Sequence, residues 1–164
     1  MKKRVIAIDP GNTKSALCLI EVETLRPLYT LYAENDEVRK FIKELYVDEY
    51  DFAAIEMMQS YGNLIGKDVL NTAVWIGRFY EVLKRKLGKN PAMIYRKEEA
   101  VHLCNTVRNG DKEIRRALID RFCTHDFRTG RGTIKNPDFF RGFKKDLWAA
   151  YAVGLTYIET KMEV

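Results

Sequence analysis

Residues 5–21 read VIAIDPGNTKSALCLIE, two apolar stretches on either side of a short turn. Residues 4–9 have the continuous apolar side chains of a buried strand, which ends on the acid Asp9. The tripeptide Pro-Gly-Asn then turns the chain, and residues 15–21 predict a second strand. Residues 28–33 predict a third strand, with partial alternation. The close spacing of the turns indicates three antiparallel strands in a meander.

The remainder of the chain predicts helices that alternate with two further strands. Residues 125–143 contain three glycines and a proline, and we expect a mobile loop there. The order of elements indicates a single-domain α/β fold over residues 1–164, with a five-stranded mixed sheet flanked by helices. The other expected elements are a helix capped by Asn35, strands 52–58 and 91–95, and helices 64–87, 98–104, 111–122 and 144–159.

Composition excludes a disordered chain and indicates an anionic partner. Of the 164 residues, 46% are hydrophobic and 12% are aromatic, enough for a substantial core. The formal net charge is +5, and the positive charge is concentrated: residues 107–145 contain eleven Lys and Arg against five Asp and Glu. Such an excess favours a polyanion such as a nucleic acid, because neutralising phosphates releases counterions.

The cysteines and the N-terminus predict a cytoplasmic protein. Cys18, Cys104 and Cys123 form no C-x-x-C pair, which argues against a disulfide scaffold or a thiolate zinc site. The first residues, MKKRVIAIDPG, do not form a signal peptide. No apolar run approaches the roughly 18 residues of a membrane span, so we expect no membrane partner.

Three acids occupy positions where a carboxylate is costly. Asp9 ends one apolar strand, Glu56 interrupts another, and Asp146 opens the last helix. If the first and fourth strands are neighbours, Asp9 and Glu56 lie at one end of the sheet, and the last helix can bring Asp146 beside them. Converging carboxylates repel each other, and hard cations such as Mg²⁺ or Mn²⁺ relieve this repulsion. Paired ions about 4 Å apart promote phosphodiester cleavage.

The segments that carry these acids resemble the RuvC-type Holliday junction resolvases of the RNase H-like nuclease superfamily, including their small phage-type relatives. The resemblance implies an RNase H-like fold in which Asp9, Glu56 and Asp146 are catalytic and bind Mg²⁺ or Mn²⁺. It also implies a homodimer whose two sites nick symmetric strands of a four-way DNA junction, an activity of DNA recombination and repair. The matching segments are VIAIDPGNTKSALCLIE, DFAAIEMMQSYGN, IGKDVLNTAVWIGRFYEVLK, NGDKEIRRALIDRF and KKDLWAAYAVGLTYIE.

The chain departs from the family pattern at two positions. The family usually has a second acid one turn further along its last helix, where this chain has Ala149. The aromatic residue that follows the acid of the fourth strand is displaced: Gln59 stands there, and Tyr61 is nearby. Because Gly62 follows Tyr61, we expect Tyr61 to stack on an unpaired base at a junction centre or to anchor the loop.

Basic residues and one aromatic residue suggest the binding surfaces. Trp75 lies off the stripe of Val69, Ala73 and Ile76 on the helix 64–87, which indicates either a dimer interface or packing under a loop. In the resemblance, the helix 111–122 borders the catalytic cleft, and two lysines precede Asp146. The expected DNA-binding residues, with Tyr61, are Lys112, Arg115, Arg116, Lys144 and Lys145.

Three alternatives stay open. The same fold can act on other branched DNA or on RNA, and Ala149 is compatible with a catalytically weak junction-binding protein. The segment IDPGNTKSAL also resembles the phosphate-binding opening of actin-like ATPases and type III pantothenate kinases. Those enzymes clasp a nucleotide between two such domains, whereas 164 residues supply one, so we expect no nucleotide cofactor.

Overall fold

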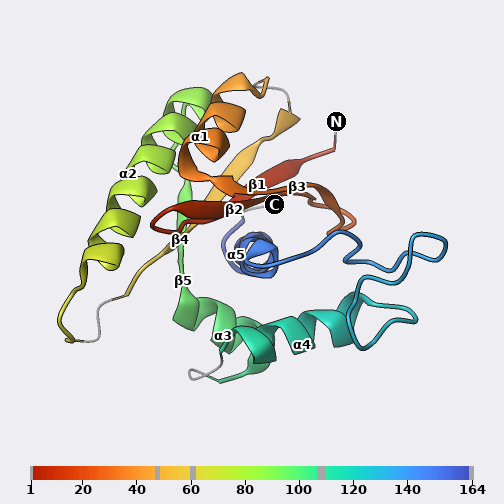
Figure 1. The fold of residues 1–164 in the computed structure, drawn as a ribbon. Coiled ribbons are helices and arrows are strands. Elements are labelled where there is room, and N and C mark those ends of the chain that lie inside the picture. Colours follow the sequence, from red (N-terminus) through yellow and green to blue (C-terminus); the bar gives the residue numbers. More distant parts are fainter. Residues whose placement is uncertain (1, 47–48, 60–61, 107–109, 163–164) are drawn as a thin grey trace.

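A five-stranded mixed sheet forms the centre of the computed structural model, which describes residues 2–46, 49–59, 62–106 and 110–162 (Figure 1). The first three strands form an antiparallel meander, as predicted, and β1 pairs in parallel with β4, which pairs in parallel with β5. The strand order β3-β2-β1-β4-β5 joins β1 (Arg4–Asp9), β2 (Lys14–Glu21), β3 (Pro27–Glu34), β4 (Phe52–Met57) and β5 (Ala92–Tyr95).

Helices cover both faces of this sheet (Figure 1). On one face, α1 (Asn35–Glu44) and α2 (Lys67–Leu87) pack against each other and close a core with Ile6, Ile8 and Phe79. On the other face, α5 (Leu147–Thr160) crosses β1 and β2. Outside α5 lie α3 (Arg96–Cys104) and α4 (Asp111–Phe122), which pack against each other and against α5. These elements confirm the predicted α/β architecture.

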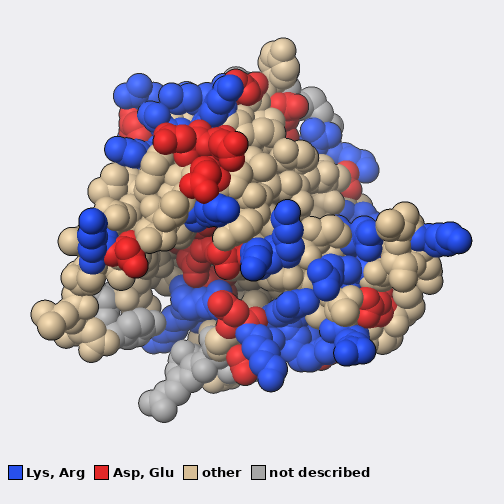
Figure 2. Space-filling model, in the orientation of Figure 1, with Lys and Arg blue, Asp and Glu red and all other residues tan. Residues whose placement is uncertain are grey.

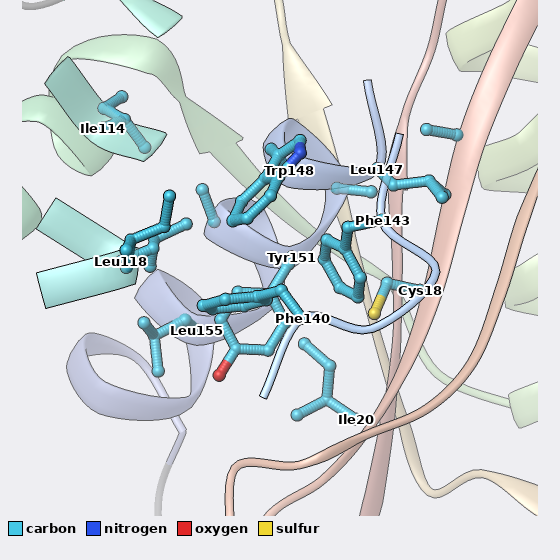
Figure 3. Packing of buried hydrophobic residues seen from close by; sticks show 14 of the residues in the cluster. Cys18, Ile20, Ile114, Leu118, Phe140, Phe143, Leu147, Trp148, Tyr151 and Leu155 are labelled. Atoms are coloured by element: carbon cyan, nitrogen blue, oxygen red, sulfur yellow. The ribbon is translucent and has the colours of Figure 1, made fainter. Parts of the chain in front are cut away.

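The last part of the segment between α4 and α5 is packed into the core, which contradicts the expectation of a mobile loop over all of residues 125–143. Phe140 and Phe143 are almost completely buried and pack against Trp148 and Tyr151 of α5 (Figure 3). The Tyr151 hydroxyl donates a hydrogen bond to the Leu25 carbonyl, 2.8 Å away. Large aromatic side chains bury enough apolar area to fix a loop that lacks regular secondary structure.

Asp138 organises the backbone of this segment. Its carboxylate is buried and accepts hydrogen bonds from backbone N–H groups. Burial by itself raises the pKa of Asp138, but these hydrogen bonds outweigh it and hold the pKa below its usual range. Turn-forming residues therefore build a fixed loop here, because their polar groups are satisfied internally. The donors are Thr124, His125, Asp126 and Phe139.

Three details differ from the sequence-based expectations. Val69 and Ala73 of α2 are exposed instead of lining the core, because the N-terminal half of α2 extends beyond α1 (Figure 1). α3 begins at Arg96 rather than at residue 98, and α5 begins at Leu147 rather than at residue 144. In the described part of the chain, no helix has both the length and the apolar character that crossing a membrane requires.

α5 approaches the sheet closely at a glycine. A Cβ atom on Gly154 would lie 2.5 Å from Ile20 Cδ1 and 2.9 Å from Ala7 Cβ. Such contacts are shorter than packed carbon atoms tolerate, so the absence of a side chain at Gly154 sets the distance between helix and sheet.

We predict opposite effects for the same substitution at two helical glycines. Gly154→Ala is expected to lower the free energy of unfolding by about 1–3 kcal/mol, because overpacking outweighs the better helix propensity of alanine. Gly77→Ala in α2, where an added Cβ meets nothing within 4 Å, is expected to raise it by roughly 0.5–1 kcal/mol. Urea unfolding monitored by circular dichroism measures both, and equal stabilisation by both would contradict the close contact of α5.

Candidate active site

Asp9 and Glu56 lie side by side at one end of the sheet. β1 and β4 are parallel neighbours in which Ile8 pairs with Ile55, so the residue that follows in each strand carries an acid. Both carboxyl groups are half-buried. The prediction that the first and fourth strands place these two acids together is confirmed.

The surroundings of Asp9 perturb its pKa. Burial is the main factor that raises the pKa of Asp9 well above its usual range, followed by a side-chain hydrogen bond with Glu56. The negative charges of Asp146 and Glu99 raise it further. Burial and the neighbouring negative charges therefore both disfavour the ionised form of Asp9.

A third buried acid, Glu99, belongs to this cluster and was missed at the sequence level. Glu99 lies in α3 with no exposed surface. Its pKa is raised to about 9 by burial and by the neighbouring Glu56, against the opposing effect of Arg96. The sequence RKEEA gives little sign of this, because two glutamates in the first turn of a helix are normally solvated. Only the packing of α3 against α4, α5 and β5 distinguishes Glu99 from Glu98.

Arg96, at the start of α3, is the nearest positive charge to these acids. Its Nη1 atom lies 3.9 Å from Glu56 Oε1 and 3.8 Å from Glu99 Oε2. These distances are too long for hydrogen bonds. The other end of the guanidinium, Nη2, donates to the exposed carboxylate of Asp111. Arg96 therefore offsets part of the charge of Glu56 and Glu99 without satisfying their oxygen atoms.

Asp146 lies at the edge of the cluster. It is exposed at the N-cap of α5, and its charge acts on Asp9 through space. A cleft of about 210 Å³ borders Asp146, and its lining includes four positively charged side chains and a second acid, Asp111. An anionic ligand that enters this cleft therefore meets basic groups next to the acids. The lining includes Arg96, Lys112, Arg115, Lys145 and Ala149.

The acids form pairs rather than a closed cage. Across residues 2–46, 49–59, 62–106 and 110–162, no three Asp, Glu, His or Cys side chains are grouped as they would be around a metal ion. The donors nevertheless suit a hard cation, since all are carboxylate oxygens and those of Glu99 are buried without a hydrogen-bond donor. The donor chemistry therefore fits Mg²⁺ or Mn²⁺.

The candidate DNA-binding residues differ in whether their charged groups are free to contact a ligand or are held by other side chains. Lys112, Lys144 and Lys145 are exposed, and none forms an ion pair with another described residue. Arg115 lies over the Trp148 ring, 4.5 Å from its centroid. Arg116 is held by the Asp120 carboxylate, 2.6 Å away, and by the Phe127 carbonyl.

Basic side chains nevertheless dominate this region of the surface. Figure 2 shows Lys and Arg gathered over the part of this face where Figure 1 places α3, α4 and the chain that leads into α5, with smaller groups of acidic side chains among them. The remaining candidate, Tyr61, lies outside the described residues.

Comparison with known proteins shows the fold. The sequence matches no protein-family model and no curated protein sequence. The structure is similar to that of RuvC from Thermus thermophilus, with a TM-score of 0.67 and 16% identity over 94% of this chain and 92% of that one. A second structure, T. thermophilus RuvC in complex with a Holliday junction substrate, gives a TM-score of 0.63 at 15% identity over the same shares. The chain therefore has the RNase H-like fold of RuvC.

Proposed function

We propose that this protein is a divalent-metal-dependent endonuclease that resolves four-way DNA junctions by paired symmetric nicks. The observation that carries this proposal is the placement of Asp9 and Glu56 side by side, on two strands far apart in the sequence, near a cleft whose lining includes four basic side chains. A RuvC structure of the same fold contains a Holliday junction substrate, which supports the choice of substrate.

Asp9, Glu56 and Asp146 are the proposed catalytic residues and ligands for Mg²⁺ or Mn²⁺. When bound, the cation supplies Lewis-acid stabilisation of the charge that develops on the scissile phosphate. The carboxylates orient the attacking water and accept its proton. Lys145, adjacent to Asp146 and exposed, supplies positive charge near a phosphate that enters the cleft.

DNA binding is assigned to the basic surface over α4 and the start of α5. Lys112, Lys144 and Lys145 have ammonium groups free to neutralise phosphates, and the release of counterions then drives binding. Arg115 is held by Trp148, and Arg116 is held by Asp120. They therefore contribute mainly to the positive electrostatic potential of this surface.

A second candidate function is junction binding with weak catalysis. Two observations favour it: Ala149 provides no carboxylate on α5, and no three ligands are grouped around one point among the described residues. Cleavage of other branched DNA or of RNA remains an alternative substrate range for the same site, and the first experiment below separates these cases.

We further propose a homodimer formed through the N-terminal part of α2. Trp75 is half-buried: its ring centroid lies 5.6 Å from that of Phe79 and 4.6 Å from Arg78 Cζ. Only part of the Trp75 side chain is therefore available to a partner subunit. The more exposed apolar side chains precede it, and such a patch is typical of an interface. They are Leu64, Ile65, Val69, Leu70 and Val74.

We predict that Asp9→Asn, Glu56→Gln and Asp146→Asn each reduce cleavage of a labelled four-way junction by at least about 10²-fold, because each removes a cation ligand. Junction affinity should persist or increase, since negative charge is removed. Denaturing gels measure cleavage with Mg²⁺ or Mn²⁺ and with EDTA, and mobility shifts measure affinity. Near-normal cleavage by one variant would make that acid structural.

The same assay should include duplex, flap and RNA–DNA hybrid substrates. Paired nicks in the junction alone support resolution, and equal cleavage of flaps or hybrids points to the broader nuclease. Tight metal-independent junction binding without cleavage by the wild-type protein would instead support the junction-binding function.

We predict that Lys112→Ala weakens binding to every DNA shape and lowers the dependence of log affinity on log salt by about one unit, as expected for one lost phosphate contact. Lys84→Ala, an exposed charge on α2 away from the cleft, serves as the matched control and should leave binding unchanged. Fluorescence anisotropy at several salt concentrations measures both variants. Equal losses for the two variants would show that only net charge matters.

We predict that the wild-type protein is a dimer at micromolar concentration and that Leu70→Glu converts it to a monomer. Leu70 is 55% exposed, so the added charge disrupts an interface without disturbing the core. Light scattering after gel filtration measures the molecular mass. Lys84→Glu, at another exposed position of α2, serves as the control. A monomeric wild-type protein would overturn the proposed interface.

A further inference from the structure

Glu99 combines complete burial with the lack of any hydrogen-bond donor. Its side chain has no exposed surface. No donor among the described residues reaches either Oε1 or Oε2. A buried carboxylate without partners costs several kcal/mol, and natural proteins rarely keep such a group unless it binds something.

The neighbouring Glu98 supplies the structural roles that a glutamate can have in this turn. Its carboxylate accepts the backbone N–H of Tyr95 at 2.7 Å, which completes the N-terminal cap of α3. It also pairs with Lys161 at 2.6 Å. Glu99 therefore caps nothing, and helix formation does not explain its presence.

Arg96 does not explain Glu99 either. Its Nη1 atom lies 3.8 Å from Glu99 Oε2 and 3.9 Å from Glu56 Oε1, so one nitrogen atom serves both carboxylates. The short contact of this guanidinium goes to Asp111, on the exposed side. One guanidinium at these distances leaves the pair of Glu56 and Glu99 undercompensated.

The Glu99 side chain points into the candidate active site. Glu99 Oε2 and Glu56 Oε1 both lie within 4 Å of the same Arg96 nitrogen, Nη1, so the two carboxylates approach one point, and the charge of Glu99 also acts on Asp9. Its unpartnered oxygens thus lie among the acids proposed to bind a metal ion. An additional hard cation would satisfy these oxygens and relieve the repulsion within the group.

We propose that Glu99 is a further metal-binding carboxylate of this site, supplied by α3 in addition to the ligands on β1, β4 and α5. This inference rests on the proposed metal-dependent function. It gives the site a fourth carboxylate from a different helix, while Ala149 on α5 provides none. Arg96 then acts as the counter-ion that holds Glu56 and Glu99 together when no metal is present.

The test measures metal binding itself. Mn²⁺ is titrated into the full-length protein and free Mn²⁺ is followed by electron paramagnetic resonance, while calorimetry records the melting temperature with and without Mn²⁺. Glu99→Gln and Glu99→Met are compared with Glu98→Gln, whose amide oxygen still accepts the Tyr95 N–H. Asp9→Asn is included as a reference for loss of the proposed site.

We expect Glu99→Gln and Glu99→Met to weaken Mn²⁺ affinity at least about tenfold and to reduce the rise in melting temperature that Mn²⁺ produces. Without metal, both should melt at or above the wild-type temperature, because an unsatisfied buried carboxylate has been removed. Glu98→Gln should bind Mn²⁺ like the wild type.

Two results together would overturn the role of Glu99 and leave the proposed function intact. The folded Glu99 variants would bind Mn²⁺ as tightly as the wild type, and Asp9→Asn would lose Mn²⁺ affinity. A wild-type protein that binds no Mn²⁺ would overturn both. Failure of both Glu99 variants to fold would also overturn the proposal, since a metal ligand is not required for folding without metal.

Discussion

The parallel pairing of β1 with β4 is the constraint on which the candidate site depends. It fixes Asp9 and Glu56 next to each other at the same end of the sheet, and both residues are half-buried. The two acids are far apart in the sequence, because two parallel strands can be joined only by a long crossover connection. In this chain β2, β3 and α1 together form the connection from β1 to β4, and the packing of α1 with α2 closes the core on one face of the sheet.

The other face of the sheet positions α5 and its N-terminus. The missing side chain of Gly154 lets the helix approach Ile20 and Ala7, and Phe140 and Phe143 fill the space beside Trp148 and Tyr151 (Figure 3). Because these rings are rigid and nearly completely buried, they fix where α5 begins. The loop between α4 and α5 therefore contributes to the site indirectly, by holding Asp146 near Asp9.

Charge is distributed unevenly around this framework. Acids that repel one another gather at the end of the sheet, and exposed lysines lie along the adjoining cleft. Repulsion of this kind is a common feature of sites that bind charged ligands. Glu99 shows this most clearly, because its environment opposes ionisation and no donor compensates for it.

The sequence by itself determined the order and type of the elements, the antiparallel meander, and the unusual positions of Asp9, Glu56 and Asp146. These follow from local apolar patterns and from the cost of an acid in an apolar strand. Only the tertiary structure decided that Glu99 is buried while Glu98 is not, that Val69 is exposed, and that Phe140 and Phe143 are packed into the core. Each of these depends on which distant element covers a side chain, and no local pattern in the sequence contains that information.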